Sequence, residues 1–431
     1  MPRLAKPVSS AKAAGRGGKL SDEALLGLVQ RQTFRYFWEG AHPISGLARD
    51  RRPKLADPKD DAVAVAVGGS GFGAMAILVA CERGWVTRGQ ALARFTAMLD
   101  CLEKATCYHG MYPHFMHGGT GATIPFSRKD DGGDLVETAF LFQGLLCVRA
   151  YFDRDAPEEA RLRDRIGYLW REAEWDWFTR GGRNALTWHW SPTNGFALNH
   201  EIRGWNECLV AYVLAASAPR YSVPVEAYHE GWAAGREFLN GRSFEGVELP
   251  LGPDGGGPLF PAHFSFCGVD PRGLSDAYAD YWRQNVNHTR INYAYCVRNP
   301  NGNKGYGPNC WGLSAGDTDA GYAANAPGRD RGVVSPSAAL SSFPYAPAEA
   351  MAALRHFTED LGDRIWGRFG FVDGFSEQHD WYADAFLAIS QGPTVVMIEN
   401  YRSGLLWKLF MGVPEIQAGM KKLGFRSPHW A

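Results

Sequence analysis

Three groups of charged side chains have residue types and spacings suited to acid and base chemistry. The first contains Asp130, Asp131, Asp134 and Glu137, directly before a strongly apolar segment. Asp134 and Glu137 are three residues apart, so both side chains project near one face of a helix that begins there. The same Asp-x-x-Glu pattern is also a capping box, in which the carboxylates satisfy free backbone N–H groups. The pattern predicts a helix start and leaves both roles open.

The second group is Glu201 and Glu207, which precede the apolar run 208–216. Glu207 lies beside Trp205 and Asn206, where partial burial would raise its pKa and keep it protonated. A protonated carboxyl group is what a general acid requires, so Glu207 is the candidate acid. Glu201 is interpreted as a solvated charge at a helix start.

The third group is Glu399 and Arg402, three residues apart within an apolar segment that also contains Tyr401. An ordinary ion pair along a helix explains this spacing best. The alternative is a polar island that faces a pocket from within an apolar helix.

Metal and phosphate chemistry are weakly indicated. His109, His114 and His117 lie within nine residues, but their spacing matches no strong zinc signature and no thiol or carboxylate nearby completes a set. The glycine-rich run 68–73 resembles a phosphate cradle only in its glycine count, because no Gly-Lys-Ser/Thr follows. We therefore predict no metal and no cofactor.

Composition favours a neutral sugar as the ligand. The chain has 15 Trp, 17 Tyr and 24 Phe, many of them beside Gly, Asn and His, and exposed aromatic faces stack on sugar rings. Its formal net charge of −1 gives no long-range field for nucleic acid or anionic lipid. We expect an oligo- or polysaccharide partner, with neither nucleic acid nor membrane bound.

Helices must position these side chains, because helical periodicity dominates and strand alternation is scarce. A dozen helices in consecutive pairs predict an all-α fold, an (α/α)6 toroid of antiparallel hairpins. The connections 107–133, 179–199, 241–274 and 298–334 exceed ordinary helix–helix turns and are expected to form a cleft. The predicted helices span about 21–40, 71–81, 87–106, 134–153, 157–175, 200–217, 224–240, 275–297, 347–361, 380–391, 394–411 and 413–423.

One domain is expected over 21–431, after a disordered segment 1–20 that is basic and rich in small residues. That segment lacks the apolar stretch of a secretory signal, and no run approaches the length of a membrane span. As written, the chain is expected to be cytoplasmic and monomeric.

Several ordered motifs together resemble the bacterial glycoamylase-like family, glycoside hydrolase family 144. The resemblance covers about residues 21–425. It rests on Phe37-Trp38-Glu39, His42-Pro43, Ser45-Gly46-Leu47, Asp50-Arg51, Gly71-Phe72-Gly73, the segment 134–140, Trp205-Asn206-Glu207, Gln391-Gly392-Pro393 and the segment 398–402.

This resemblance implies an (α/α)6 barrel and an inverting, metal-free hydrolysis of β-1,2-glucan, with an endo-glucanase as the expected type. It places Asp134, Glu137 and Glu207 on acidic positions of the family's cleft. The candidate catalytic residues are Glu207, Asp134, Glu137, Asp130 and Glu399. The candidate substrate-binding residues are Trp38, Arg51, His117, Trp188, Trp205, Asn206, Trp311, Tyr401 and Arg402.

One position departs from the family pattern. Ser390 stands before Gln-Gly-Pro, where the family commonly has Asp, a natural base for activating water. Asp384, Glu399 or Asp130 are candidate substitutes. The alternatives are a glucan transglycosylase or binding protein, an α-glucan hydrolase as the older glucoamylase label implies, and a sugar epimerase on a similar toroid. Family members are commonly exported, which leaves localisation open.

Overall fold

The computed structural model describes residues 19–55 and 63–430. The predicted disordered segment 1–20 therefore lies outside the described residues, except for Lys19 and Leu20. The helices are α1 Asp22–Trp38, α2 Val67–Glu82, α3 Arg88–Leu102, α4 Leu135–Tyr151, α5 Pro157–Arg171, α6 Leu209–Ser217, α7 Tyr281–Arg298, α8 Pro336–Leu340, α9 Pro347–Glu359, α10 Gly362–Ile365, α11 Ala388–Arg402, α12 Leu405–Met411 and α13 Pro414–Lys422. The strands are β1 Arg51–Pro53, β2 Ala64–Ala66, β3 Phe115–His117, β4 Thr123–Ile124, β5 Gly133–Asp134, β6 His189–Trp190, β7 Leu239–Phe244, β8 Val247–Leu251, β9 Ala315–Thr318, β10 Gly321–Ala324, β11 Trp366–Gly367, β12 Gly370–Phe371, β13 Phe375–Ser376, β14 Trp381–Tyr382 and β15 Ala385–Leu387.

Local capping signals place the helix starts. The Ser21 hydroxyl accepts a hydrogen bond from the Ala24 N–H at the start of α1. At the start of α3, Thr87 and Gln90 form the expected capping box. Asp134 caps α4. Each cap satisfies backbone donors that a helix end leaves free, so these predictions are confirmed.

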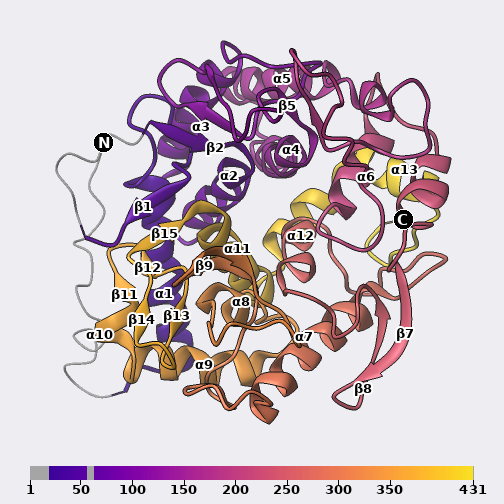
Figure 1. Ribbon diagram of the computed structural model, residues 1–431. Coiled ribbons are helices and arrows are strands. Elements are labelled where there is room, and N and C mark those ends of the chain that lie inside the picture. The colour runs from indigo at the N-terminus through magenta and orange to yellow at the C-terminus, as the bar shows by residue number, and fades with distance from the viewer. Residues whose placement is uncertain (1–18, 56–62, 431) are drawn as a thin grey trace.

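The helices surround a common centre (Figure 1), with segments from opposite ends of the chain side by side. Helix α2 packs against α4 and α11, and α1 packs against both α2 and α11. Helix α4 also contacts α6 and α12, while α13 packs against α6 and α12. The prediction of a helix-rich fold is confirmed at this level. Among the described helices, none has the length and apolar character needed to cross a bilayer.

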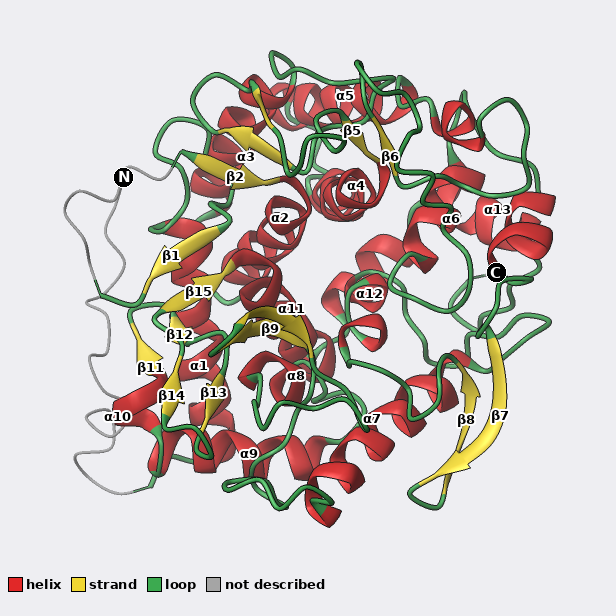
Figure 2. Cartoon of the chain, in the orientation of Figure 1, coloured by secondary structure: helices red, strands yellow, loops and turns green. Residues whose placement is uncertain are grey.

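Short antiparallel strands are more numerous than the sequence predicted. Most lie in two-stranded pairs, and β7 and β8 form a long hairpin at the edge of the molecule (Figure 2). Two pairs join distant segments: β1 pairs with β15, so Arg51 faces Leu387, and β5 pairs with β6, so Asp134 faces His189. These two pairs carry side chains of the candidate site.

Four predicted helices were wrong in extent. The segment 200–217 becomes helical only at Leu209, and 224–240 contains one π-helical turn, Ala227–Trp232, before β7. Close packing explains the second case, because a Cβ on Gly231 would lie 2.0 Å from the backbone oxygen of Asn184. The boundary predicted between 380–391 and 394–411 was also wrong. Helix α11 runs through Pro393, since burial on most sides outweighs proline's helix penalty.

The glycine-rich run 68–73 belongs to α2, where it allows two helices to pack closely. A Cβ on Gly71 would lie 2.0 Å from the carbonyl oxygen of Phe140 in α4. Reciprocally, a Cβ on Gly144 in α4 would lie 2.1 Å from the carbonyl oxygen of Gly71. The glycines serve helix packing at this crossing.

Gly71→Ala is therefore expected to lower the free energy of unfolding by about 3 kcal/mol, because the added methyl meets backbone that cannot move aside. Gly27→Ala is the matched control, since Gly27 lies inside α1 and a Cβ added there would meet no atom within 4 Å. That change should raise stability by about 0.5 to 1 kcal/mol, the helix preference of Ala over Gly. Denaturant unfolding measures both, and equal effects would contradict the packing argument.

Candidate active site

Asp134 combines the two roles that its sequence pattern left open. Its Oδ1 accepts the N–H groups of Val136 and Glu137, both at 3.0 Å, which caps α4. Its Oδ2 lies 3.1 Å from Nδ1 of His114 and 3.6 Å from Nδ1 of His189. Asp134 is fully buried, so both oxygens are committed to protein groups.

His114 lies between two carboxylates. Its Nδ1 donates to Asp134, and its Nε2 is 4.0 Å from Oε1 of Glu137. Burial opposes the imidazolium charge, but the charges of Glu137 and Asp134 outweigh it and raise the pKa of His114 to about 10. Burial alone would raise the pKa of Asp134, yet the hydrogen bond and charge of His114 hold it below its usual range. Asp134 and His114 thus form a fixed charge pair.

Glu137 does not complete the capping box. Its Oε2 accepts the Gly68 N–H at 2.7 Å, near the start of α2. Burial raises the pKa of Glu137 to about 7, with the Asp134 charge adding to the effect and the His114 charge opposing it. Glu137 therefore holds a proton more readily than an exposed glutamate does.

Asp130 also lies beside these residues. Its side chain is buried, and its Oδ2 lies 3.3 Å from Nδ1 of His189. His114, Asp130 and Asp134 present three possible ligand atoms within 4.8 Å of one another, so these residues could hold a cation if His114 gave up its proton. We call His114, Asp130, Asp134, Glu137 and His189 the histidine–carboxylate cluster.

Glu207 lies in the turn before α6, and its backbone oxygen accepts the hydroxyl of Ser265. Burial raises the pKa of Glu207 to about 7, and the charge of Asp134 contributes in the same direction. The predicted direction of this shift is confirmed. Because the charge of Asp134 acts on Glu207, the acid candidate lies within electrostatic reach of the histidine–carboxylate cluster.

A second acidic group surrounds Arg51. The guanidinium binds both oxygens of Asp317, at 2.6 and 3.0 Å. Asp373 is buried beside them: its Oδ1 accepts the Ser390 hydroxyl at 2.6 Å and its Oδ2 accepts the Asp317 N–H at 2.7 Å. Burial raises the pKa of Asp373 to about 6. The two hydrogen bonds have the opposite effect, because they stabilise the ionised carboxylate, but burial outweighs them. We call Arg51, Asp317, Asp373 and Ser390 the arginine–carboxylate group.

Tyr322 lies within electrostatic range of both the arginine–carboxylate group and Glu207. It lies on β10, in the hairpin with β9 that carries Asp317, and 58% of its surface is exposed. Although the residue is exposed, protein around its hydroxyl group limits solvation and raises its pKa, and the charges of Asp373, Asp317, Asp50 and Glu207 raise it further. Because the charges of both Asp373 and Glu207 act on this phenol, we infer that these two carboxyl groups border one site.

Aromatic side chains near this site are partly open. Trp188 stacks on His200, with ring centroids 5.0 Å apart, and also on His189. Phe126 is 57% exposed, and its ring lies 4.6 Å from that of His114. Trp188, Phe126 and Tyr322 are thus the aromatic surfaces best placed to meet a sugar. The Oδ1 of Asn206 accepts a hydrogen bond from the Cys208 N–H, which fixes the turn that carries Glu207.

The proposed sugar contacts of three tryptophans need correction. Trp311 is fully buried and donates to the Glu349 carbonyl, and Trp205 packs against Trp232 in the core. Trp38 is 5% exposed, with the Arg94 guanidinium 4.3 Å above its ring. Protein side chains cover these rings, so no stacking face remains for a ligand.

Glu399, Tyr401 and Arg402 lie apart from the site. Glu399 is buried and binds Arg83 through both oxygens, at 2.8 and 2.9 Å. Arg83 ends α2, whereas Glu137 meets the start of α2, about 20 Å away for a helix of this length. Tyr401 packs against Phe343, and Arg402 binds Gln30 and Glu23 rather than Glu399. The predicted ion pair between Glu399 and Arg402 was wrong. Glu399 is instead paired with Arg83 at the end of α2, and Arg402 with side chains of α1.

The three clustered histidines also separate. His117 accepts the N–H of Gly119 within its own loop, so its expected sugar contact is not supported by this geometry. His109 binds Glu174 and stacks on Trp177, with ring centroids 3.8 Å apart. Only His114 enters the candidate site.

Sequence reasoning missed Asp317, Tyr322 and Asp373, and it treated His114 only as a metal ligand. The sequence did offer a signal for Asp317 and Tyr322. Both lie in the long connection 298–334, which was expected to help form the cleft. Asp373 had none, since short buried strands flank it.

Comparison with known proteins assigns the chain to a family. The Glycoamylase family model matches residues 199–414. An endo-β-1,2-glucanase from Chitinophaga pinensis, solved with sophorotriose and glucose, is 49% identical with a TM-score of 0.93, covering 96% of this chain and 100% of that one. The chain belongs to the glycoamylase family. The family resemblance that the motifs indicated is therefore confirmed.

Other relatives of this glycoamylase-family chain differ from it in length or in sequence identity. An exo-β-1,2-glucooligosaccharide sophorohydrolase from Parabacteroides distasonis is 42% identical over 425 residues, which is 94% of this chain and 58% of that protein. The chain thus spans little more than half of that relative. An endo-β-1,2-glucanase from Talaromyces funiculosus has a TM-score of 0.66 at 12% identity, over 96% of this chain and 94% of that one, so it shows the fold alone.

Proposed function

We propose that this chain is a glycoside hydrolase that cleaves β-1,2-glucan with inversion and without a metal. The observation that carries the proposal is Glu207, a partly buried carboxyl group with a pKa of about 7 within electrostatic reach of Asp134. The relatives named above, hydrolases of β-1,2-linked glucans, support the substrate class. An endo mode, a monomeric state and a single (α/α)6 toroid over 21–431 belong to the same proposal.

Glu207 is the general acid in this proposal. Inverting cleavage needs one protonated carboxyl group at the leaving oxygen and one ionised carboxylate that activates water across the sugar ring. Glu207 suits the first role because burial keeps its proton near neutral pH. Asp134 does not suit the second role, since both its oxygens are bound to protein groups. It instead holds His114 charged and in place.

Asp373 is the proposed base, acting through Ser390. The Ser390 hydroxyl lies where the family commonly has a carboxylate, and it donates to Asp373 at 2.6 Å. A water bound at Ser390 Oγ would attack the anomeric carbon and pass its proton to Oγ, while the hydroxyl proton moves to Asp373. At the same time Glu207 gives its proton to the leaving sugar oxygen. One serine and one buried aspartate thus do the work of a single aspartate.

Ser390 also favours a second candidate, a transglycosylase. If the relay through Ser390 activates water poorly, the hydroxyl of another glucan chain would be the better acceptor. Hydrolysis creates one new reducing end for each bond cleaved, whereas transfer conserves their number. Counting reducing ends while sizing the products distinguishes the two activities.

The substrate test is incubation with β-1,2-, β-1,3- and α-1,4-glucans, followed by product sizing and by NMR of the first-formed anomer. We expect cleavage of the β-1,2-glucan alone, with the α-anomer formed first because inversion changes the configuration. Cleavage of α-1,4-glucan alone would instead support the older glucoamylase label.

The pH profile of kcat/KM is expected to be bell-shaped, with its maximum between about 6 and 7. Asp373 must be ionised, so activity falls as pH drops below its pKa of about 6. Glu207 must be protonated, so activity falls as pH rises above its pKa of about 7. Initial rates at low substrate measure this, and a flat profile from about pH 5 to about pH 9 would contradict both roles.

A further inference from the structure

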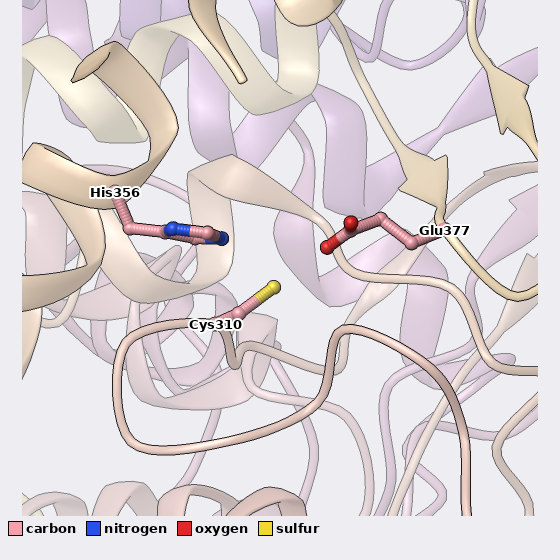
Figure 3. Close-up of side chains that lie close together, drawn as sticks. All are labelled: Cys310, His356 and Glu377. Carbon is pink, nitrogen blue, oxygen red and sulfur yellow. The ribbon is translucent and has the colours of Figure 1, made fainter. Parts of the chain in front are cut away.

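A cysteine, a histidine and a glutamate converge outside the candidate active site. Cys310 belongs to the connection between α7 and β9, His356 lies on α9 and Glu377 directly follows β13. Figure 3 shows the three side chains pointing toward one another from these separate elements. One possible ligand atom from each residue lies within 4.8 Å of the other two.

His356 is oriented as a metal ligand commonly is. Its Nδ1 lies 2.8 Å from Oδ2 of Asp360, and because a carboxylate only accepts, Nδ1 carries the hydrogen. Nε2 then has a free lone pair. It is buried and has no hydrogen-bond partner among the described residues. A carboxylate that fixes the far nitrogen of a ligating histidine is a recurrent feature of zinc sites.

Among the described residues, Glu377 forms no salt bridge, although Arg364 lies within range of its charge. Cys310 is 3% exposed, and burial together with the nearby Glu377 charge raises the pKa of its thiol. The thiolate form of Cys310 next to the Glu377 carboxylate is unfavourable without a cation, because two negative charges would lie close together away from water. A dication reverses that balance, because it stabilises both the thiolate and the carboxylate.

We propose that Cys310, His356 and Glu377 bind one zinc ion. A thiolate, an imidazole nitrogen and a carboxylate oxygen form a ligand set that suits Zn²⁺, with water as the fourth ligand. Tetrahedral bonds of about 2.0 to 2.3 Å require the ligand atoms to approach slightly from their present spacing. The Cys310 proton passes to solvent on binding.

The ion would join three elements, one of which leads into the candidate active site. The connection that contains Cys310 continues into the β9–β10 hairpin, which carries Asp317 and Tyr322. Glu377 follows β13, four residues after Asp373. Zinc would thus tie this connection to α9 and to the β13–β14 pair. The role is structural, because these ligands include no member of the histidine–carboxylate cluster or the arginine–carboxylate group.

Metal titration of the full chain tests the proposal. The chain is stripped with a chelator, dialysed and titrated with Co²⁺ and Zn²⁺. We expect one equivalent to bind and cobalt to produce a thiolate-to-metal charge-transfer band, with intense visible bands typical of tetrahedral geometry. Cys310→Ser should abolish the charge-transfer band. Cys107→Ser is the control, because Cys107 is exposed and lies in another loop.

Two further variants distinguish this site from metal binding elsewhere on the chain. Asp360→Asn should weaken zinc binding by about 10- to 100-fold while the cobalt band persists, because Asp360 only orients His356. Asp130→Asn should leave the band unchanged, since the alternative group of His114, Asp130 and Asp134 contains no sulfur. Zinc should raise the Tm of the stripped protein by several degrees, while kcat at 25 °C survives chelation. Absence of a charge-transfer band in the wild-type chain, or its persistence in Cys310→Ser, overturns the proposal.

Discussion

Glu207→Gln is expected to lower turnover on β-1,2-glucan by about 100-fold or more, while affinity for the glucan changes little. Glutamine keeps the shape of the side chain but has no titrating proton, and general-acid losses are of this size. The reason lies in the environment, because burial holds the pKa of Glu207 near 7 and keeps its proton available. Initial rates, together with a direct binding measurement, test this prediction.

Leaving-group chemistry sharpens the test. A substrate with a strongly acidic phenol as leaving group needs no proton, so the variant should lose far less activity on it than on the glucan. Glu201→Gln is the matched control: Glu201 is close in sequence but pairs with Arg203 at 2.7 Å. We expect that control to keep nearly full turnover. If Glu207→Gln retains more than about a tenth of wild-type turnover, the role passes to Glu137, whose pKa is also about 7.

Asp373→Asn is expected to lower hydrolysis by about 100- to 10,000-fold, because the amide cannot take the proton that water gives up. The change leaves a side chain of the same shape, so the hydrogen bonds around Ser390 can largely persist. Ser390→Ala should also lower turnover, by at least about tenfold, since it removes the link between water and Asp373. Reducing-end release from β-1,2-glucan measures both changes.

Small anions offer a readout that a merely structural role would not move. Azide needs no base, so it should restore bond cleavage in Asp373→Asn and yield a glycosyl azide of the α configuration. Asp384→Asn is the control, because Asp384 is exposed and was an alternative base on sequence grounds. Near-normal hydrolysis by Asp373→Asn, or a comparable loss in Asp384→Asn, would show that Asp373 is not the base.

The sequence by itself determined much of the local structure. Apolar periodicity and caps located α1, α3 and α4, because hydrogen bonds at helix starts involve residues only two or three positions apart. It also indicated the raised pKa of Glu207, since its apolar neighbours are adjacent in the chain. The family could be recognised from motifs in a fixed order, because such motifs are a property of the sequence itself.

Only the tertiary structure decided which side chains meet. His114 lies between Asp134 and Glu137, and Asp373 binds Ser390, through contacts that no local pattern encodes. Antiparallel pairing of β1 with β15 joins residues more than 300 positions apart. Periodicity shows which face of an element is buried but not what covers it. For that reason Trp311 proved to be core, and Glu399 was bound by Arg83 from another helix.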